Sequence, residues 1–113
     1  MRTIIAGSRS CNDYCQVLHA VRDCGWRITA VISGRARGVD RLGERWANEH
    51  CVPLELFAAK WREQGPAAGH VRNALMADNA DALIALWDSD SPGTKGMIDI
   101  AVRKGLLVHV HFV

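Results

Sequence analysis

The chain has 113 residues, of which 49% are hydrophobic and 23% are charged, and its formal net charge is +2. This length suits one domain spanning residues 1–113, and the apolar fraction excludes wholesale disorder. No run approaches the ~18 consecutive apolar residues of a membrane span, so we expect no membrane partner. Fourteen basic against twelve acidic residues make bulk charge a weak argument for nucleic-acid binding.

The first residues, Met1–Gly7, are typical of a strand that ends at a glycine, not of a signal peptide. We therefore expect a cytoplasmic protein whose four cysteines are reduced. None of these cysteines forms a C-x-x-C pair, and only Cys11 and Cys15 could share a helix face. Packing or surface positions explain them better than zinc does, so we expect no metal site and no cofactor.

The hydrophobic period switches regularly along the first part of the chain. Thr3–Ala6 is a short apolar run, which predicts a buried strand. Residues 12–24 have apolar side chains at helical spacing and are followed by a glycine, which predicts a helix. Residues 28–32 are rich in β-branched side chains and precede a Ser-Gly pair, which predicts a second strand.

The middle of the chain repeats this alternation. Asp40 stands where an N-cap is expected, ahead of a helix whose apolar face would hold Leu42, Trp46 and Ala47. Residues 53–57 predict a third strand, with proline at its first position. A polar loop over residues 60–65 would follow, and Pro66 would then open a helix running to about residue 79. The inward side chains of that helix would be Val71, Leu75 and Met76.

The last third begins with Ala82–Trp87, whose continuous apolar run indicates a strand covered on both faces. Residues 89–93 read as a turn-rich loop. A further amphipathic helix would present Met97, Ile98, Ala101 and Val102, and residues 106–110 would form the last strand. Strands that alternate with helices of ~10 to 15 residues predict an α/β fold. We expect a Rossmann-like, doubly wound sheet of about five parallel strands with helices on both faces.

Ligands bind such sheets at the carboxyl ends of the strands, where the strand order reverses. Four loops that should meet there are rich in glycine, small hydroxyl side chains and arginine, a combination that suits a phosphate-bearing ligand. The candidate ligand-binding residues are Gly7, Ser8, Arg9, Gly34, Arg35, Ala36, Gly38, Arg72, Asn73, Asp88, Ser91, Gly93 and Thr94.

Each of these features also has a plain structural explanation. A glycine after a strand can serve only as a turn, and Arg35 and Arg37 taken alone would be solvated surface groups. Trp61 lies near the expected crevice and is a candidate for stacking on a base, although simple packing is the more common role of tryptophan. His109 and His111 alternate along the last strand, which indicates an outward strand face and not a metal pair.

Two groups of motifs together resemble the SLOG superfamily, the Rossmann-like group that includes the DNA-processing protein DprA and the LOG-type lysine decarboxylase-like proteins. The first group is Ile5–Arg9 with Ile32–Asp40. The second, similar to the small stand-alone YspA-like branch, consists of Trp61, Gly65, Ala67, Ala68, Gly69, Arg72, Asn73, Met76, Gly93, Thr94, Met97 and Ile98. The resemblance covers essentially the whole chain.

The resemblance implies a nucleotide-derived ligand. Gly7, Ser8 and Arg9 would line one edge of the pocket and Gly34 and Gly38 its floor. Arg72, Asn73, Gly93 and Thr94 would face the phosphate.

The chain also departs from its relatives. Met97 stands where LOG-type phosphoribohydrolases carry a glutamate that acts on the glycosidic bond. Arg35 replaces the second glycine of the usual Gly-Gly pair, and Lys60 replaces an acidic residue.

Three functions are compatible with this pattern. The leading hypothesis is a sensor or sequestering protein for a nucleoside monophosphate, an ADP-ribose-like molecule or a cyclic nucleotide. The second is a nucleotide hydrolase that would use Asp40, Arg72 and Asp88. The third is a DprA-like binder of single-stranded nucleic acid, for which Arg9, Arg35, Arg37, Lys60 and Trp61 would form the contact edge. We also expect a homodimer, in which Trp46 and Met97 would be buried between the subunits.

Overall fold

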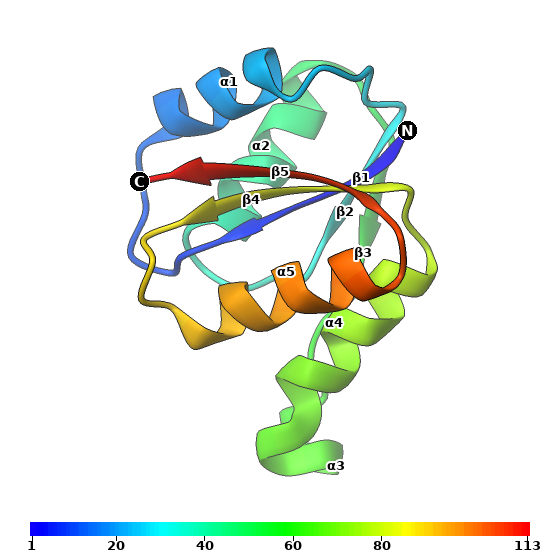
Figure 1. Cartoon of the computed structure of the whole chain (residues 1–113). Helices are drawn as coiled ribbons and strands as arrows, with labels where there is room; N and C mark the ends of the chain where they lie inside the picture. The colour runs from blue at the N-terminus through cyan, green and yellow to red at the C-terminus, as the bar shows by residue number, and fades with distance from the viewer.

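Five parallel strands form one sheet in the computed structural model, which describes residues 1–113 (Figure 1). The strands are β1 (Arg2–Gly7), β2 (Ala30–Ser33), β3 (Leu54–Leu56), β4 (Ala82–Trp87) and β5 (Leu107–Phe112). Their order is β3-β2-β1-β4-β5. The chain therefore winds outward from β1 to β3, crosses back over the sheet and winds outward again, which confirms the predicted Rossmann-like fold. The strand order reverses between β1 and β4.

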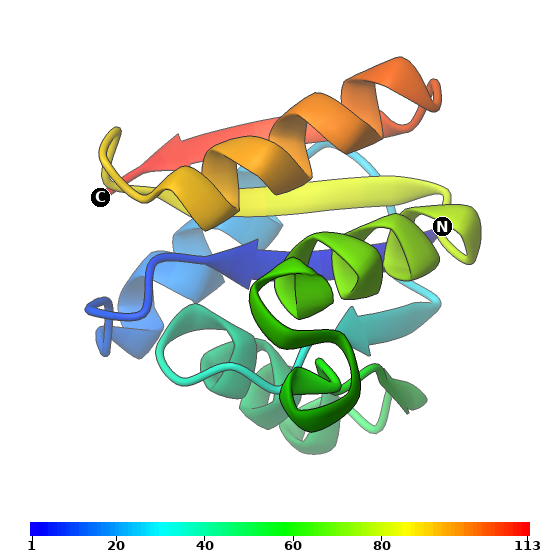
Figure 2. The ribbon, with the colours of Figure 1, turned by 90° about the horizontal axis from the view of Figure 1, so that it is seen from below.

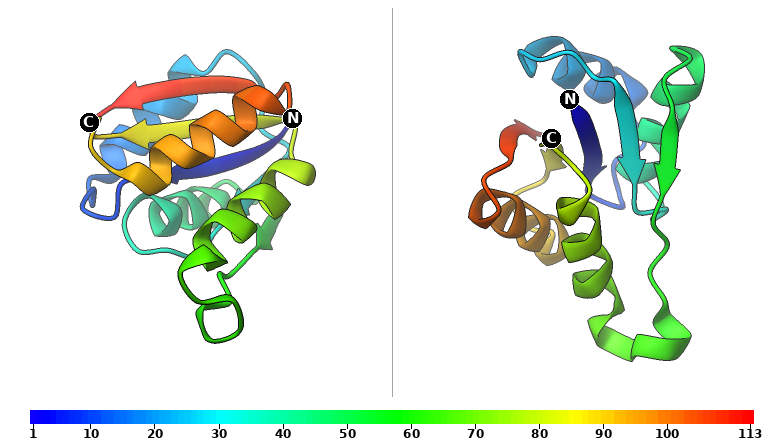
Figure 3. Two further views of the ribbon diagram at one scale, coloured as in Figure 1. Left: turned by 60° about the horizontal axis from the view of Figure 1, so that its bottom comes forward. Right: turned by 90° about the vertical axis from the view of Figure 1, so that its right-hand side faces the viewer.

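Two pairs of helices cover the two faces of this sheet. Helices α1 (Tyr14–Asp23) and α2 (Val39–Glu49) lie on one face, and α4 (Ala68–Asp78) and α5 (Pro92–Arg103) lie side by side on the other (Figures 1 and 2). The short helix α3 (Trp61–Gln64) and the 3₁₀ turn η1 (Gly65–Ala67) connect β3 to α4 and project beyond the sheet (Figure 3). None of these helices is long and apolar enough to cross a bilayer.

The core has two halves because successive strand residues point to opposite faces. In β1, Ile5 packs with α1 and α2, whereas Ile4 packs with α4 and α5. In β4, Ile84 faces the first pair of helices and Leu83 the second. All four side chains are fully buried. Strand β4 is thus buried on both faces, as its unbroken apolar run predicted.

Several predicted details of the helices were wrong. Helix α2 begins at Val39, after Gly38 with a φ of 79°, so Asp40 lies inside the first turn and is not the N-cap. Residues 61–64 form helix α3, not a loop. Helix α4 begins at Ala68, not at Pro66, and Leu75 is 49% exposed because the buried face consists of Ala68, Asn73, Met76 and Ala77. Val102 of α5 is 61% exposed.

The structure also removes the basis given for a homodimer. Trp46 belongs to the core between the sheet and α2, where 8% of its surface is exposed. Met97 is 1% exposed in the core on the opposite face. Because both side chains are already buried within their own chain, neither can be buried further between two subunits. The homodimer stays a prediction without this support.

Candidate functional site

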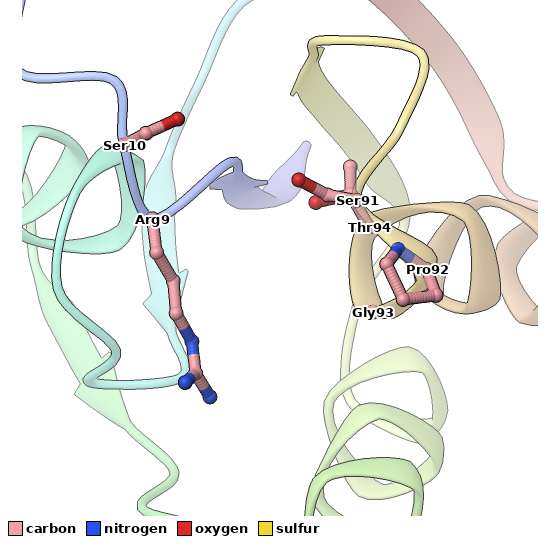
Figure 4. Close-up of a pocket in the computed structure, with 6 residues that line it drawn as sticks. All are labelled: Arg9, Ser10, Ser91, Pro92, Gly93 and Thr94. Carbon is pink, nitrogen blue, oxygen red and sulfur yellow. The ribbon is translucent and has the colours of Figure 1, made fainter.

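A pocket of about 400 Å³ lies where the strand order reverses, between the loop after β1 and the start of α5 (Figure 4). We call it the α5 pocket. Arg9 stands on one side of it and the first turn of α5 on the other. Its lining residues are Arg9, Ser10, Ser91, Pro92, Gly93 and Thr94. The position is the one at which doubly wound sheets usually bind their ligands.

The first turn of α5 presents free backbone donors to this pocket. Ser91 is the N-cap residue, yet its hydroxyl bonds to Ser8 Oγ at 3.2 Å and to Asp88 Oδ2 at 3.0 Å instead of capping the helix. Pro92 occupies the first helical position and has no N–H. The N–H groups of Gly93 and Thr94 therefore have no partner in the helix. With the helix dipole, they favour an anion at this point.

Arg9 is the cation that faces this helix end. Its side chain is exposed, and no carboxylate lies within ion-pair distance of it. A guanidinium offers five N–H donors in a planar array that matches phosphate and carboxylate groups. The α5 pocket thus combines an unpaired arginine with unpaired backbone amides, and none of its lining residues is acidic.

A second pocket of about 280 Å³ adjoins the first, and the two share Arg9, Pro92 and Gly93. We call it the Arg72 pocket. The loop before α4, the first turns of α4 and one face of α5 form its walls. Its remaining lining residues are Trp61, Pro66, Gly69, His70, Arg72, Asn73 and Gly96. As in the α5 pocket, no aspartate or glutamate lines it.

Arg72 connects α4 to the loop after β2. Its Nη1 donates to the carbonyl of Gly34 at 2.8 Å, and its Nε donates to Asn73 Oδ1 at 3.2 Å. Burial lowers the pKa of Arg72 from its usual value, the charge of Asp40 opposes this shift and the charge of Arg9 adds to it. Arg72 has no carboxylate within 4.0 Å, so a partly desolvated cation faces the pocket.

Asp40 lies behind this arginine. A Cβ atom on Gly34 would stand 2.9 Å from Asp40 Oδ2 and 3.0 Å from the Arg72 side chain, so Gly34 leaves room for both groups. Burial raises the pKa of Asp40 to about 6, although the N–H of Ala36 at 3.2 Å and the charge of Arg72 lower it. Asp40 is 4% exposed and lines neither pocket.

The guanidinium of Arg35 is engaged within the protein. Arg35 has a φ of 64°, the left-handed conformation that suits a glycine at this position. Its Nη1 donates to Glu44 Oε1 at 2.8 Å, and Ser33 donates to the other oxygen of Glu44 at 2.6 Å. Sequence reasoning missed Glu44, although its position one helical turn after Asp40 could have indicated that it faces the same loop.

The glycines nearest β1 shape the loops and do not line the pockets. A Cβ on Gly7 would collide with the Leu86 carbonyl, and one on Gly38 would stand 2.5 Å from the Ser8 carbonyl. Ser8 itself is 1% exposed and accepts a hydrogen bond from the N–H of Asp88 at 3.2 Å. These residues hold the loops after β1, β2 and β4 against one another.

Asp88 has a similar structural role. Its Oδ1 accepts from the N–H groups of Ser91 at 2.7 Å and Asp90 at 2.9 Å, which closes the turn into α5. These bonds hold the pKa of Asp88 at about 2, so the side chain is a carboxylate at neutral pH. It lines neither the α5 pocket nor the Arg72 pocket.

Trp61 begins α3 and lines the Arg72 pocket with half of its surface exposed. Its ring lies over Gly69 of α4, where an added Cβ would stand 3.4 Å from the indole. Arg37 and Lys60, by contrast, are exposed and line neither pocket. Ser10, Gly69 and His70 line the pockets and were not among the candidates, although they belong to the loops in which candidates were sought.

The two histidines of β5 do not form the outward face that their alternation indicated. His111 Nε2 lies 2.7 Å from Gln16 Oε1 of α1, and His109 Nε2 is buried without a hydrogen-bond partner. Helix α1 therefore partly covers this face of the strand. No three or more histidine, cysteine, aspartate or glutamate side chains are grouped so that they could hold a metal ion.

The comparisons with known proteins agree with this architecture. A sequence model of the family described as YspA, cpYpsA-related SLOG matches residues 1–63, which is more than half of the chain. The chain belongs to this SLOG family. It is also 34% identical over 116 residues to the Gene 61 protein of Mycobacterium phage D29, an alignment that covers 95% of this chain and 93% of the phage protein. No solved structure matches.

The family match spans β1 to the start of α3 and so includes Arg9 and the loop after β2. Membership of this family fits a nucleotide-related function in general. Arg72, Asn73 and the first turn of α5 lie beyond residue 63, where the alignment with the phage protein continues.

Proposed function

We propose that this SLOG protein binds a nucleotide-derived molecule through a phosphoryl group held in the α5 pocket, and acts as a sensor or a sequestering protein. One observation carries the proposal: an unpaired arginine, Arg9, faces the unpaired amides of Gly93 and Thr94 across an open pocket. Charged donors together with helix amides bind phosphate strongly. Trp61 stands in the adjoining pocket, where its exposed ring could stack on a base.

Binding is favoured over hydrolysis by the positions of the carboxylates. General acid or base catalysis needs a carboxyl group within hydrogen-bond reach of the scissile bond. Asp40 has a raised pKa but lies behind Arg72, and Asp88 is fixed in a turn. Met97, which replaces the glutamate of LOG-type enzymes, is buried in the core. No acidic side chain lines either pocket, and this supports a binding protein.

The test is calorimetric titration of the protein with AMP, ADP-ribose and cyclic dinucleotides. We expect Arg9→Gln to weaken binding about 10- to 100-fold, because a hydrogen bond to a charged group contributes about 1.5–3 kcal/mol. Arg27→Gln is the matched control. It removes the same charge from an exposed arginine just before β2, at the opposite edge of the sheet, and should leave the affinity unchanged.

Three results would contradict the proposal. The first is no binding of any of these nucleotides at millimolar concentration by the folded protein. The second is conversion of a nucleotide into hydrolysis products, which would favour the enzyme. The third is tight binding of single-stranded DNA that weakens steeply with salt, which would favour the nucleic-acid binder. A cytoplasmic location and a homodimer stay predictions, to be checked by fractionation and by light scattering.

A further inference from the structure

We infer that the ligand carries at least two linked phosphoryl groups, as a nucleoside diphosphate or one of its esters does, with one in the α5 pocket and one in the Arg72 pocket. This inference rests on the proposed function and narrows its ligand class. A single phosphoryl group would occupy only one of the two pockets, which share Arg9, Pro92 and Gly93 along their common boundary.

Each pocket contains one polar side chain that is more than nine-tenths buried and has an unpaired group. In the α5 pocket this is Thr94, 6% exposed, whose hydroxyl makes no hydrogen bond within the protein. In the Arg72 pocket it is Asn73, 7% exposed. The Asn73 carbonyl accepts from Arg72 Nε, but its NH₂ group has no partner. Both groups remain accessible in their pockets, where each can donate a hydrogen bond to a phosphoryl oxygen.

The charges of the two pockets also suit two anionic groups. Arg9 borders both pockets, and Arg72 lies in the second, partly desolvated and without an ion pair. The charge of Arg9 disfavours the charged form of Arg72, as expected for neighbouring cations. A diphosphate, which carries adjacent negative charges, would relieve this repulsion and pair both guanidinium groups at once.

The lining of the Arg72 pocket leaves a place for the rest of such a ligand. Trp61 and Gly69 form its outer wall, and His70 extends from the same turn of α4. A phosphoryl group beside Arg72 and Asn73 would therefore connect the phosphoryl group at α5 to a nucleoside or sugar near the indole ring.

The experiment compares AMP with ADP by calorimetry in EDTA, so that no metal ion alters the charge of the nucleotides. For the wild type we expect ADP to bind at least tenfold more tightly than AMP. Arg72→Gln should reduce this ratio to below about threefold and leave AMP binding largely intact. Arg9→Gln should weaken the binding of both nucleotides, because Arg9 borders both pockets.

A second variant guards against misfolding, since Arg72 also bonds to the carbonyl of Gly34. Asn73→Asp has nearly the same shape and keeps an acceptor for Arg72 Nε, but it places a carboxylate in the Arg72 pocket. It should weaken ADP at least tenfold and AMP by less. Equal affinities of the wild type for AMP and ADP, or an unchanged ratio in both variants, would overturn the inference and leave the proposed function standing. Failure of the wild type to bind AMP, ADP, ADP-ribose and the cyclic dinucleotides alike would overturn both.

Discussion

The loop after β2 and the turn after β4 have similar compositions, with glycine, small hydroxyl side chains and charged groups, but the structure uses them differently. In the β2 loop the polar groups bond to neighbouring helices: Arg35 pairs with Glu44 of α2, and the carbonyl of Gly34 accepts from Arg72 of α4. In the β4 turn, Asp88 and Ser91 form the local hydrogen bonds, and the helix amides that follow stay open. The β2 loop therefore has a structural role, and the β4 turn presents the groups that could bind a ligand.

The glycines of the two segments differ in the same way. A side chain on Gly38 would meet the carbonyls of Ser8 and Arg9, whereas one on Gly93 would meet nothing within 4 Å. Gly38 is thus required for close packing of two loops, and Gly93 leaves space for a ligand to approach the backbone. Composition alone does not separate these two roles.

The largest expected effect is the loss of stability on changing Gly38. Gly38→Ala would put a Cβ 2.5 Å from the Ser8 carbonyl at a φ of 79°. Overpacking and an unfavourable backbone conformation together should lower the free energy of unfolding by about 2–5 kcal/mol. Denaturant unfolding of the purified variant measures this change.

Gly93→Ala is the matched control from the other segment. Gly93 lies in the first turn of α5 with open space around it, so alanine should raise the free energy of unfolding by up to about 1 kcal/mol. Equal losses of stability in the two variants would show that the β2 loop and the β4 turn are packed alike around their glycines.

The second effect concerns Asp40 of α2, whose carboxylate accepts a hydrogen bond from the N–H of Ala36 in the β2 loop. Burial raises the pKa of Asp40 to about 6, from 3.8 in an exposed chain. At a pH between these two pKa values, Asp40 is protonated in the folded protein and ionised in the unfolded chain. The contribution to stability is therefore complete below about pH 4 and is lost as the pH rises through 6, by on the order of 3 kcal/mol in total.

Asp40→Asn replaces the titrating carboxyl group with a neutral amide and keeps an oxygen that can accept from the N–H of Ala36. The measurement is denaturant unfolding of both proteins from pH 4 to pH 7. We expect the variant to gain stability relative to the wild type by on the order of 3 kcal/mol across this range. His111, whose pKa is lowered chiefly by burial, contributes equally to both proteins and cancels in the difference. A constant difference between the two curves would mean that Asp40 does not titrate in this range.

Much of the fold could be predicted because each element has a local cause. The apolar run of β4 and the glycines that follow helices can be recognised within short segments of the sequence, and the alternation of strands and helices predicts a doubly wound sheet. Leu75 was misplaced because the apolar residues of α4 fit two overlapping faces: the face that packs on the sheet holds Met76 and Ala77, and Leu75 points about 100° away from Met76.

The site was harder to predict, since its polar groups choose their partners through space. The sequence placed Arg9, Arg72, Asn73 and Thr94 at one edge of the sheet; Arg9 lines both pockets and each of the others lines one. It could not indicate that Glu44 would engage Arg35, because that pairing depends on the left-handed turn at Arg35. Nor could it separate Ser8, which is buried in loop contacts, from Ser10, which lines the pocket.

The smallest expected effect is that of Arg35→Gly, which gives the Gly-Gly pair that the resemblance to the SLOG superfamily implies for this loop. Glycine removes the strain of a φ of 64°, and the same change deletes the ion pair with Glu44. Glu44 is buried but keeps the hydroxyl of Ser33 at 2.6 Å and Arg41 at 4.0 Å as partners, which limits the loss. The two terms oppose each other, so the free energy of unfolding should change by less than about 1 kcal/mol.

Nucleotide affinity should change less than about threefold in Arg35→Gly, against at least tenfold in Arg9→Gln, because only Arg9 lacks an internal partner. Parallel titrations of the two variants with the same nucleotide measure this ratio. A loss of affinity in Arg35→Gly as large as in Arg9→Gln would mean that Arg35 leaves Glu44 and contacts the ligand. The β2 loop would then be a binding segment that is closed only while the pocket is empty.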